Sequence, residues 1–325
     1  MLEIPALKNK RVVILGASGF IGRHVARAIP AGADLYLGVR SPSAAAFLFE
    51  AYGIHGNLIY LDLSNESLLR NLFRDLRPAV VFNLIGYGVD PTEREEHLMH
   101  SVNAEFPFIL CSALSGFTDV SWEGLQLIHT GSALEYGTAG GDLSEDTDCT
   151  PTTLYGQTKL DGTRKLLSAC KKNGIRGAVA RLFTVYGSGE HTGRLLPSLM
   201  ERAESQGQIQ LTGGMQERDF TYVEDVAEGL FRLSLVKDHS GDIVNLVTGK
   251  LTTVREFVMI AAGVLKISEE RLGFGALPTR KEEMNHDNVS TKRLQKLLEW
   301  IPATTIEEGI RKTETFLKTL SDRTL

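Results

Sequence analysis

The residues of this chain that are best suited to take part in a reaction are a tyrosine and a lysine four positions apart, Tyr155 and Lys159. Residues at this spacing lie on one face of an α-helix, so a phenol and an ammonium can act at the same point. The ammonium favours the phenolate and lowers the pKa of a tyrosine from its ordinary value of about 10. We therefore predict that Tyr155 exchanges a proton near neutral pH, although the same spacing also occurs in pairs that only face solvent.

A hydroxyl upstream of this pair, that of Ser132, could complete a proton-transfer site. Ser132 lies in the stretch HTGSALEYG, just after an apolar run at 125–129 that we predict to be a strand. A hydroxyl at the carboxyl end of such a strand can donate a hydrogen bond to a developing alkoxide oxygen. A serine that only shapes a turn is the alternative, and the Tyr155/Lys159 pair downstream favours catalysis.

A glycine-rich turn, GASGFIG at 16–22, precedes these residues in the chain. It stands between an apolar run at 11–15 and a helical pattern at 20–29, which are the strand and helix that a dinucleotide-binding fingerprint requires. Glycines let the backbone approach a pyrophosphate, and the N-terminus of the helix faces its negative charge. An ordinary βα turn is the alternative, but this context favours cofactor binding. The predicted contacts are Gly16, Ser18, Gly19, Phe20, Ile21 and Gly22.

The end of the second predicted strand bears on which dinucleotide is bound. An acid there commonly binds the ribose 2′-hydroxyl of NAD, but this chain has Arg40, 18 positions after Gly22. An arginine can fork onto the 2′-phosphate of NADP. We therefore predict NADP. NAD stays an alternative, because Arg40 could be a solvated surface residue and some NAD enzymes lack the acid.

Further cofactor contacts are predicted where the third and fourth strands end. Asp62 could accept a hydrogen bond from the adenine amino group, and it could also cap the helix that begins near Ser64. The backbone after the fourth strand is expected to pass close to the cofactor, since ligands bind at the carboxyl ends of such strands. The residues predicted at these strand ends are Asp62, Leu63, Leu84, Ile85 and Gly86.

The elements that must position these residues alternate between strand and helix. Apolar runs, near-continuous as in strands buried on both faces, lie at 11–15, 34–39, 58–61, 79–85, 125–129 and 177–183. Helical patterns lie at 20–29, 64–75, 92–115 and 155–172. This alternation predicts an α/β fold with a doubly wound parallel sheet of the Rossmann type.

The pattern changes after about residue 187, where segments become shorter and loops contain more glycine. Here we predict a helix at 223–236, a strand at 242–247 and helices at 253–265 and 305–319. The chain of 325 residues is long enough for two domains. We predict a dinucleotide-binding domain over 1–187 and a smaller mixed substrate domain over 188–325, with a strand or helix of 215–250 able to return to the first.

The composition argues against several classes of protein. A net charge of −5 argues against a general nucleic-acid binder. The three cysteines lack paired spacing, which suits a reducing cytosol, and no apolar run is long enough to span a membrane. The first residues lack the apolar run of a signal peptide, so we predict a cytoplasmic protein. His97 and His100 could in principle ligate a metal, but no third ligand is evident and we predict no metal site.

Six motifs in this order resemble the extended short-chain dehydrogenase/reductase family, in its nucleotide-sugar epimerase/dehydratase branch. They cover nearly the whole chain: GASGFIG (16–22), VN (102–103), SALEYG (132–137), YGQTK (155–159), RLFTVYG (181–187) and MQERDFTYVEDVA (215–227). The resemblance implies a nucleotide-sugar substrate and a homodimer formed through helices at about 92–115 and 155–172.

The resemblance also implies roles for individual residues. Ser132, Tyr155 and Lys159 would form the catalytic triad, and Asn103 would help to build the active site. Phe183 would border the nicotinamide. The expected substrate contacts are Tyr87, Ser132, Thr184 (where many members have an asparagine that touches the diphosphate), Arg218 on the diphosphate, and Arg280, which could instead be a solvated residue.

One departure from the family pattern narrows the expected reaction. The dehydratases of this branch carry an Asp-Glu pair directly after the catalytic hydroxyl residue, whereas this chain has Ala133 and Leu134. We therefore expect an NADP-dependent reductase of a nucleoside-diphosphate 4-keto-sugar, with Tyr155 as the proton donor. A nucleotide-sugar 4-epimerase is the close alternative, and a dinucleotide-sensing protein without catalysis is the alternative from another class.

Overall fold

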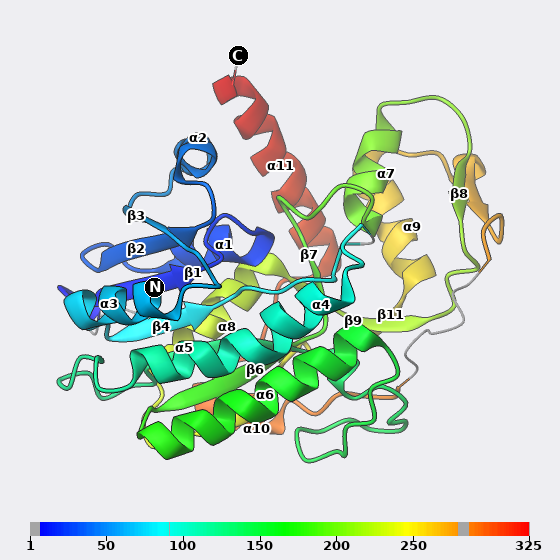
Figure 1. Cartoon of the computed structure of the whole chain (residues 1–325). Coiled ribbons are helices and arrows are strands. Elements are labelled where there is room, and N and C mark those ends of the chain that lie inside the picture. Colours follow the sequence, from blue (N-terminus) through cyan, green and yellow to red (C-terminus); the bar gives the residue numbers. More distant parts are fainter. Residues whose placement is uncertain (1–6, 91, 279–285, 325) are drawn as a thin grey trace.

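The computed structural model describes residues 7–90, 92–278 and 286–324. A parallel sheet of seven strands forms the centre of this described part, in the order β10-β6-β5-β4-β1-β2-β3 (Figure 1). Its strands are β1 (Arg11–Leu15), β2 (Asp34–Val39), β3 (Asn57–Tyr60), β4 (Val80–Asn83), β5 (Leu127–Ser132), β6 (Gly177–Leu182) and β10 (Ile243–Leu246). The strand order reverses between β1 and β4, which is the arrangement of a doubly wound Rossmann sheet and confirms the predicted fold class.

Alternate residues of the strands enter two separate hydrophobic clusters. On β1, Val12 and Ile14 point into one cluster, whereas Val13 and Leu15 point into the other. Because successive side chains of a strand face opposite sides of a sheet, this alternation shows that both faces are covered. The first face is covered by α1 (Phe20–Ala28), α2 (Pro42–Tyr52) and α8 (Val223–Ser234), and the second by α3 (Glu66–Leu76), α5 (Phe106–Leu114) and α6 (Leu154–Asn173).

The C-terminal part of the chain adds shorter elements beside the sheet. β7 (Thr184–Tyr186), β9 (Glu217–Tyr222) and β11 (Leu251–Thr253) form a small sheet, and β8 (Ile209–Leu211) pairs with β12 (Leu272–Phe274). The helices here are α7 (Leu195–Ala203), α9 (Val254–Leu265), α10 (Lys292–Leu298) and α11 (Ile306–Thr324). β10 pairs with β6 in the main sheet, and α8 packs against α1, so the chain returns to the first half after β9. The division at residue 187 stays a prediction.

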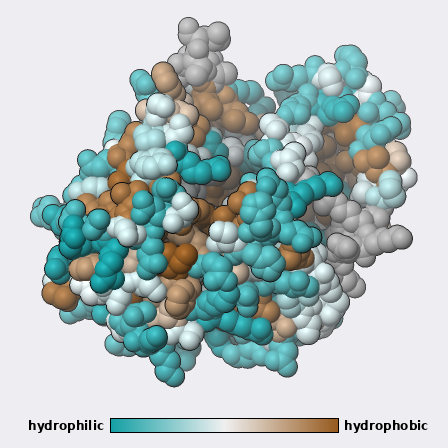
Figure 2. All heavy atoms as spheres, viewed as in Figure 1, coloured by the Kyte–Doolittle hydropathy of each residue, from teal (hydrophilic) through white to brown (hydrophobic). Residues whose placement is uncertain are grey.

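The part that carries α7, α9 and β8 stands apart from the part that carries α1, α2 and α3 (Figure 1). In the space-filling view the same face is hollowed between these two parts (Figure 2). Helix α11 runs back to α2, where the rings of Tyr52 and Phe316 lie 5.0 Å apart.

The predicted strands and helices of the first half are confirmed, with two corrections. The helix predicted at 92–115 is three consecutive segments: α4 (Glu96–Met99), a π-helix η2 (His100–Glu105) and α5. The N-cap of α3 is Asn65, whose side chain accepts a hydrogen bond from Leu68 N, and not the neighbouring Asp62 or Ser64. Within the described ranges, no helix has both the length and the apolar character needed to cross a membrane.

Candidate active site

The glycine-rich turn lies at the point where the order of the central strands reverses. Gly16 has a positive φ of 81°, and its N–H donates to Gly38 O at 3.1 Å. A Cβ added at Gly16 would lie 3.2 Å from Ile85 Cγ1 and from the carbonyl group of Leu84. The turn after β1 is therefore packed against the end of β4, and the backbone there has no room for a side chain. A crevice between these two strand ends is where doubly wound sheets bind their ligands.

The start of helix α1 is built to approach this turn closely. A Cβ at Gly22 would run into Gly16 O and into the backbone of Ala17, so only glycine lets the helix begin directly behind the turn. Gly19 is the N-cap and no side chain caps the helix, which leaves its first N–H groups for an anion. Ser18, Phe20 and Ile21 are half-buried around this helix end. The cradle fits a dinucleotide pyrophosphate, and the individual contacts stay predictions.

The proposed adenosine contacts lie at the ends of β2 and β3. Arg40 directly follows β2 and is exposed. Asp62 is half-buried beside Leu63, and its Oδ1 accepts hydrogen bonds from Ser64 Oγ at 2.6 Å and from Ser64 N at 3.0 Å. These bonds, the side-chain one first, lower the pKa of Asp62. The carboxylate shapes the turn before α3 and keeps a second oxygen for another partner.

Ser132 ends β5 and begins a short 3₁₀ turn, η3 (Ala133–Glu135). Its Oγ accepts a hydrogen bond from Leu134 N at 3.2 Å, while its own N–H donates to Glu135 Oε1 at 2.9 Å. The serine thus shapes the turn, as the alternative interpretation expected, and its hydroxyl proton remains available. The same hydroxyl lies within hydrogen-bonding reach of the Tyr155 phenol and acts to lower the pKa of Tyr155, so the structure brings these two residues together.

Helix α6 places Tyr155 and Lys159 one turn apart, after an N-cap in which Thr153 Oγ1 accepts from Gly156 N at 3.0 Å. Burial raises the pKa of Tyr155 above its ordinary value, and the nearby Glu135 adds to this effect. Ser132 acts in the opposite direction. The prediction that Lys159 lowers the pKa of Tyr155 is therefore wrong for this arrangement.

The reason lies in where the lysine points. Lys159 is buried, and its Nζ donates to Thr130 O on β5 at 2.6 Å. Burial lowers the pKa of Lys159 to about 8, and Glu135 partly offsets this shift. In this environment burial favours the uncharged form of both residues. The phenol form of Tyr155 is therefore the form that this environment favours.

Asn103 lies fully buried in the π-helix η2 and connects three segments. Its Oδ1 accepts from Tyr87 N at 3.0 Å, and its Nδ2 donates to Tyr87 O at 2.8 Å and to Thr158 Oγ1 at 3.2 Å. Thr158 in turn donates to Tyr155 O at 3.0 Å. Asn103 thus fixes the loop after β4 against the helix that carries Tyr155. π-helical turns occur often at functional sites, and nothing in the sequence pattern indicated this one.

The remaining residues predicted to contact the cofactor or the substrate come from several elements. Phe183 is half-buried between Tyr136 and His286, with ring centroids 6.3 and 5.8 Å away. Thr184 begins β7, and the guanidinium of Arg218 on β9 donates to Glu217 O at 2.7 Å. Burial lowers the pKa of Arg218. Tyr87 and Gly86 follow β4, half-buried and exposed respectively, and Arg280 lies outside the described residues.

The sequence pattern missed several charged residues around the phenol. Glu93 raises the pKa of Tyr155 and Arg194 lowers it, and they come from the loop after β4 and from the N-cap of α7. The same two loops are joined by an ion pair of 2.6 Å between Asp90 Oδ2 and His191 Nε2. These loops have no periodicity, so only the folded chain reveals the contact.

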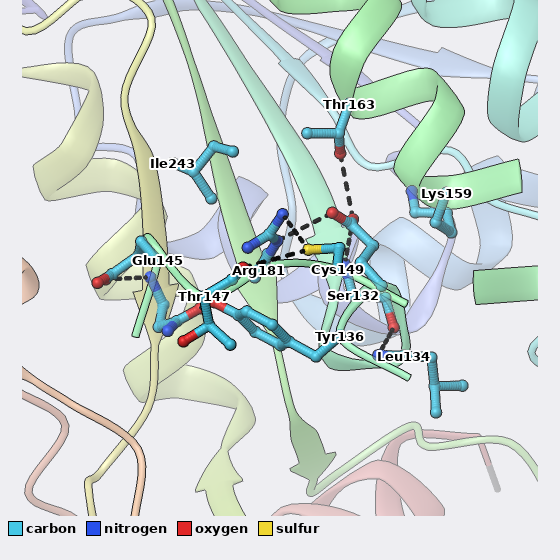
Figure 3. A network of polar contacts seen from close by, with 12 residues as sticks. Ser132, Leu134, Tyr136, Glu145, Thr147, Cys149, Lys159, Thr163, Arg181 and Ile243 are labelled. Atoms are coloured by element: carbon cyan, nitrogen blue, oxygen red, sulfur yellow. Dashed lines mark hydrogen bonds and ion pairs between the residues drawn. The ribbon is translucent and has the colours of Figure 1, made fainter. Parts of the chain in front are cut away.

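A buried polar network lies directly behind Ser132, and Figure 3 shows it with Arg181, Cys149 and Tyr136 beside the serine and with Lys159 and Thr163 on α6. Its central acid is Glu135, which pairs with Arg181 at 2.9 Å. Glu135 stands inside the SALEYG motif, but the motif gave no sign of its partner.

Known proteins match this chain along most of its length. The model of the family described as "NAD dependent epimerase/dehydratase family" matches residues 12–246. The chain is 27% identical to the dTDP-6-deoxy-L-talose 4-dehydrogenase (NAD(P)(+)) of Kitasatospora kifunensis, with 96% of each chain covered. It is 26% identical to YtcB of Bacillus subtilis, an uncharacterized UDP-glucose epimerase, over 95% of this chain and 98% of that one.

A solved structure has the same fold. The UDP-glucuronic acid 4-epimerase from Bacillus cereus, in complex with NAD, superposes with a TM-score of 0.81 at 21% identity, over 96% of this chain and 98% of that one.

Proposed function

Because this chain belongs to the NAD dependent epimerase/dehydratase family, we propose that it is an NADP-dependent reductase of a nucleoside-diphosphate 4-keto-sugar. The observation that carries this proposal is the pairing of Ser132, at the end of β5, with Tyr155 on α6, where the buried Lys159 lies one turn further along the helix. Such a pair can donate a hydrogen bond and a proton to a carbonyl oxygen that is being reduced.

The turn formed by Gly16, Gly19 and Gly22 would hold the pyrophosphate of a dinucleotide. Added Cβ atoms would press on neighbouring atoms of the chain at all three positions, so glycine keeps the turn tight against the start of α1. The nicotinamide, when bound, would supply the hydride. The residues of this chain would do the rest. Ser132 would polarise the carbonyl, and Tyr155 would deliver the proton. The buried Lys159 would bind the ribose and influence the pKa of Tyr155.

Two features favour net reduction over epimerisation and dehydration. Ala133 and Leu134 supply no acid to protonate a leaving hydroxyl, and the nearest acid, Glu135, is fully buried and ion-paired. An epimerase must first remove a proton from a sugar hydroxyl, and burial disfavours the phenolate form of Tyr155 that this step requires. The similarity to the Kitasatospora dehydrogenase agrees with a reductase. The similarity to epimerases keeps that reaction as the competing outcome.

NADP is proposed as the preferred cofactor because of Arg40. Its exposed guanidinium directly follows β2, where no acid is present to bind a ribose 2′-hydroxyl. The substrate's diphosphate is assigned to Arg218, helped by Thr184, and its sugar is assigned to the region near Tyr87. We further propose that the protein acts in the cytoplasm as a homodimer formed through η2, α5 and α6.

Incubation with NADPH and a panel of nucleotide-linked 4-keto-6-deoxy sugars tests the proposal. We expect one reduced cofactor to be consumed for each sugar reduced, with turnover lost in Tyr155→Phe by about 10²–10⁴-fold while cofactor binding is retained. Interconversion of sugar epimers without net consumption of NADPH would identify an epimerase instead. Tight cofactor binding with no turnover on any sugar would favour the sensing protein.

A further inference from the structure

The carboxylate of Glu135 is fully buried behind the proposed active site. Its Oε1 accepts hydrogen bonds from Ser132 N at 2.9 Å and from Thr163 Oγ1 at 3.1 Å, and its Oε2 pairs with Arg181 Nε at 2.9 Å. All three donors come from different elements. One carboxylate therefore connects the end of β5, the helix α6 and the strand β6.

The positions of these donors relate Glu135 to the proton-transfer residues. Ser132 is the proposed hydroxyl donor, and Glu135 holds its backbone N–H. Thr163 lies one helical turn after Lys159, on the helix that also carries Tyr155. Loss of the carboxylate would release Ser132 and α6 from each other without touching a substrate atom.

The partner of Glu135 is itself held in a fixed place. The guanidinium of Arg181 lies 4.5 Å from the ring centroid of Tyr136, and its Nη2 donates to Cys149 Sγ at 3.2 Å. A buried ion pair of this kind contributes little net stability compared with well-packed apolar residues, because both charges lose their hydration. Its presence behind the reacting groups is better explained by what its charge and geometry do there.

We infer that Glu135 is a positioning residue: its carboxylate fixes Ser132 against α6, the helix that carries Tyr155, and places a charge behind the reacting groups. That this arrangement favours reduction rests on the proposed function. The fixed geometry and the effect on the phenol do not depend on it.

The electrostatics of the site agree with this assignment. After burial, Glu135 is the largest influence that raises the pKa of Tyr155, and it also partly restores the lowered pKa of Lys159. The other ionisable groups that face the phenol are Glu93 from the loop after β4 and Arg194 at the start of α7, which act in opposite directions. Glu135 alone among these charges is also tied by hydrogen bonds to Ser132.

Glu135→Gln tests the inference, since the amide has the same shape and can still accept from Ser132 N. The readouts are the ultraviolet titration of Tyr155, taken as the difference from a Tyr155→Phe version of the same protein, and the alkaline limb of the pH profile for reduction. Both are measured with NADP(H) present. We expect both to move to lower pH by about one unit, which is a tenfold loss in proton affinity of the phenolate.

Three further variants separate charge from structure. Thr163→Val removes one hydrogen bond and keeps the charge, so its titration should stay at the wild-type pH. Glu135→Asp keeps the charge and shortens its reach, so it should lower kcat and restore the titration. Should Glu135→Gln fail to fold with an unpaired guanidinium, Glu135→Gln combined with Arg181→Met removes both charges and should show the same shift.

A folded Glu135→Gln or double variant whose titration coincides with the wild type would overturn the inference. An equal shift in Thr163→Val would do the same, because it would assign the effect to packing. These outcomes are distinct from failure of the proposed function. The phenol titration reports on the effect of Glu135 even if the protein is an epimerase. If NADPH is consumed but the titration of Glu135→Gln equals that of the wild type, only the inference about Glu135 is rejected and the proposed function stands.

Discussion

At the scale of single residues, Tyr155 and Lys159 show how burial decides the state of a proton. Burial raises the pKa of the phenol and lowers that of the amine to about 8. Their spacing on α6 suggested the reverse for the tyrosine, because charge attraction between neighbours was considered without the loss of hydration. A phenol that keeps its proton is suited to completing a reduction, which is why the reductase is preferred here.

Arg40 carries the prediction about cofactor choice. Arg40→Ala should lower kcat/KM for NADPH by about 10–100-fold, since a charge-assisted hydrogen bond is worth about 1.5–3 kcal/mol, and should leave NADH nearly unchanged. Steady-state kinetics with both cofactors measures this. Arg74→Ala is the matched control, because Arg74 is an exposed arginine in the last turn of α3. If Arg40→Ala keeps the wild-type preference between NADPH and NADH, Arg40 is a solvated surface residue with no role in cofactor choice.

At the scale of elements, the close contact between α6 and η2 depends on one glycine. A Cβ at Gly162 would run into the backbone oxygen of Asn103. Gly162→Ala should therefore push the two helices apart, cost about 1–3 kcal/mol of the free energy of unfolding, and lower kcat by displacing Tyr155. Urea denaturation and initial rates measure the two effects.

Gly263 provides the control for this substitution. It lies inside α9, and an added Cβ there would meet nothing within 4 Å. Gly263→Ala should stabilise the protein by about 0.5–1 kcal/mol, because alanine is the better helix former. If the two variants have the same free energy of unfolding and the same kcat, the close contact between Gly162 and Asn103 is not needed for stability or activity.

The link between α1 and the loop at 187–190 makes a prediction about pH. His24 is buried, and its Nε2 lies 2.8 Å from Ser188 O. Burial, opposed by this bond and assisted by Arg27 and Arg23, lowers the pKa of His24 to about 4. The unfolded chain, with an ordinary histidine, then binds the extra proton first. The stability that neutral His24 provides is present above about pH 6.5 and lost as the pH falls toward 4.

His24→Gln should remove this dependence. Between about pH 7 and about pH 4, the free energy of unfolding should fall by up to about 3 kcal/mol less in the variant than in the wild type. Urea unfolding at several pH values provides the comparison. Parallel curves for the two proteins would show that His24 is not the group responsible.

The positions of most strands and helices were predictable from the sequence, for physical reasons. The near-continuous apolar runs identified the strands of a sheet buried on both faces, and the 3.6-residue pattern identified α1, α3, α6 and α8. The π-helix around Asn103 was not predictable, because its extra residue is selected by packing against α6. The N-cap of α3 is Asn65 and not Asp62, because the carboxylate of Asp62 accepts hydrogen bonds from Ser64 in the turn before the helix.

At the scale of the whole molecule, the strand order decides where the site lies. At the reversal between β1 and β4, Gly16 packs closely against Leu84 and Ile85, and β5 brings Ser132 to the same edge of the sheet. The alternation of strands and helices was sufficient to predict that these strand ends share one edge of the sheet, and the site itself stays a prediction. The long-range partners were not predictable, because the pairing of Glu135 with Arg181 and of Asp90 with His191 joins segments that have no local signature.

The proposed dimer is also a property of the whole molecule. Phe108 on α5 is 44% exposed, and α5 is one of the elements through which the dimer is proposed to form. We expect sedimentation to give twice the mass of one chain for the wild type and the mass of one chain for Phe108→Glu. A wild type that sediments as a single chain at micromolar concentration would contradict the dimer.

Transfer of deuterium from NADPH labelled at nicotinamide C4 would show directly whether this protein reduces a keto-sugar. With a nucleotide-linked 4-keto sugar, we expect one deuterium per product molecule, on the carbon that was the ketone and in one stereochemical configuration, detected by NMR. The label should be absent from the sugar when Tyr155→Phe is used. Deuterium that stays with the cofactor while the sugar changes configuration would rule out the reductase.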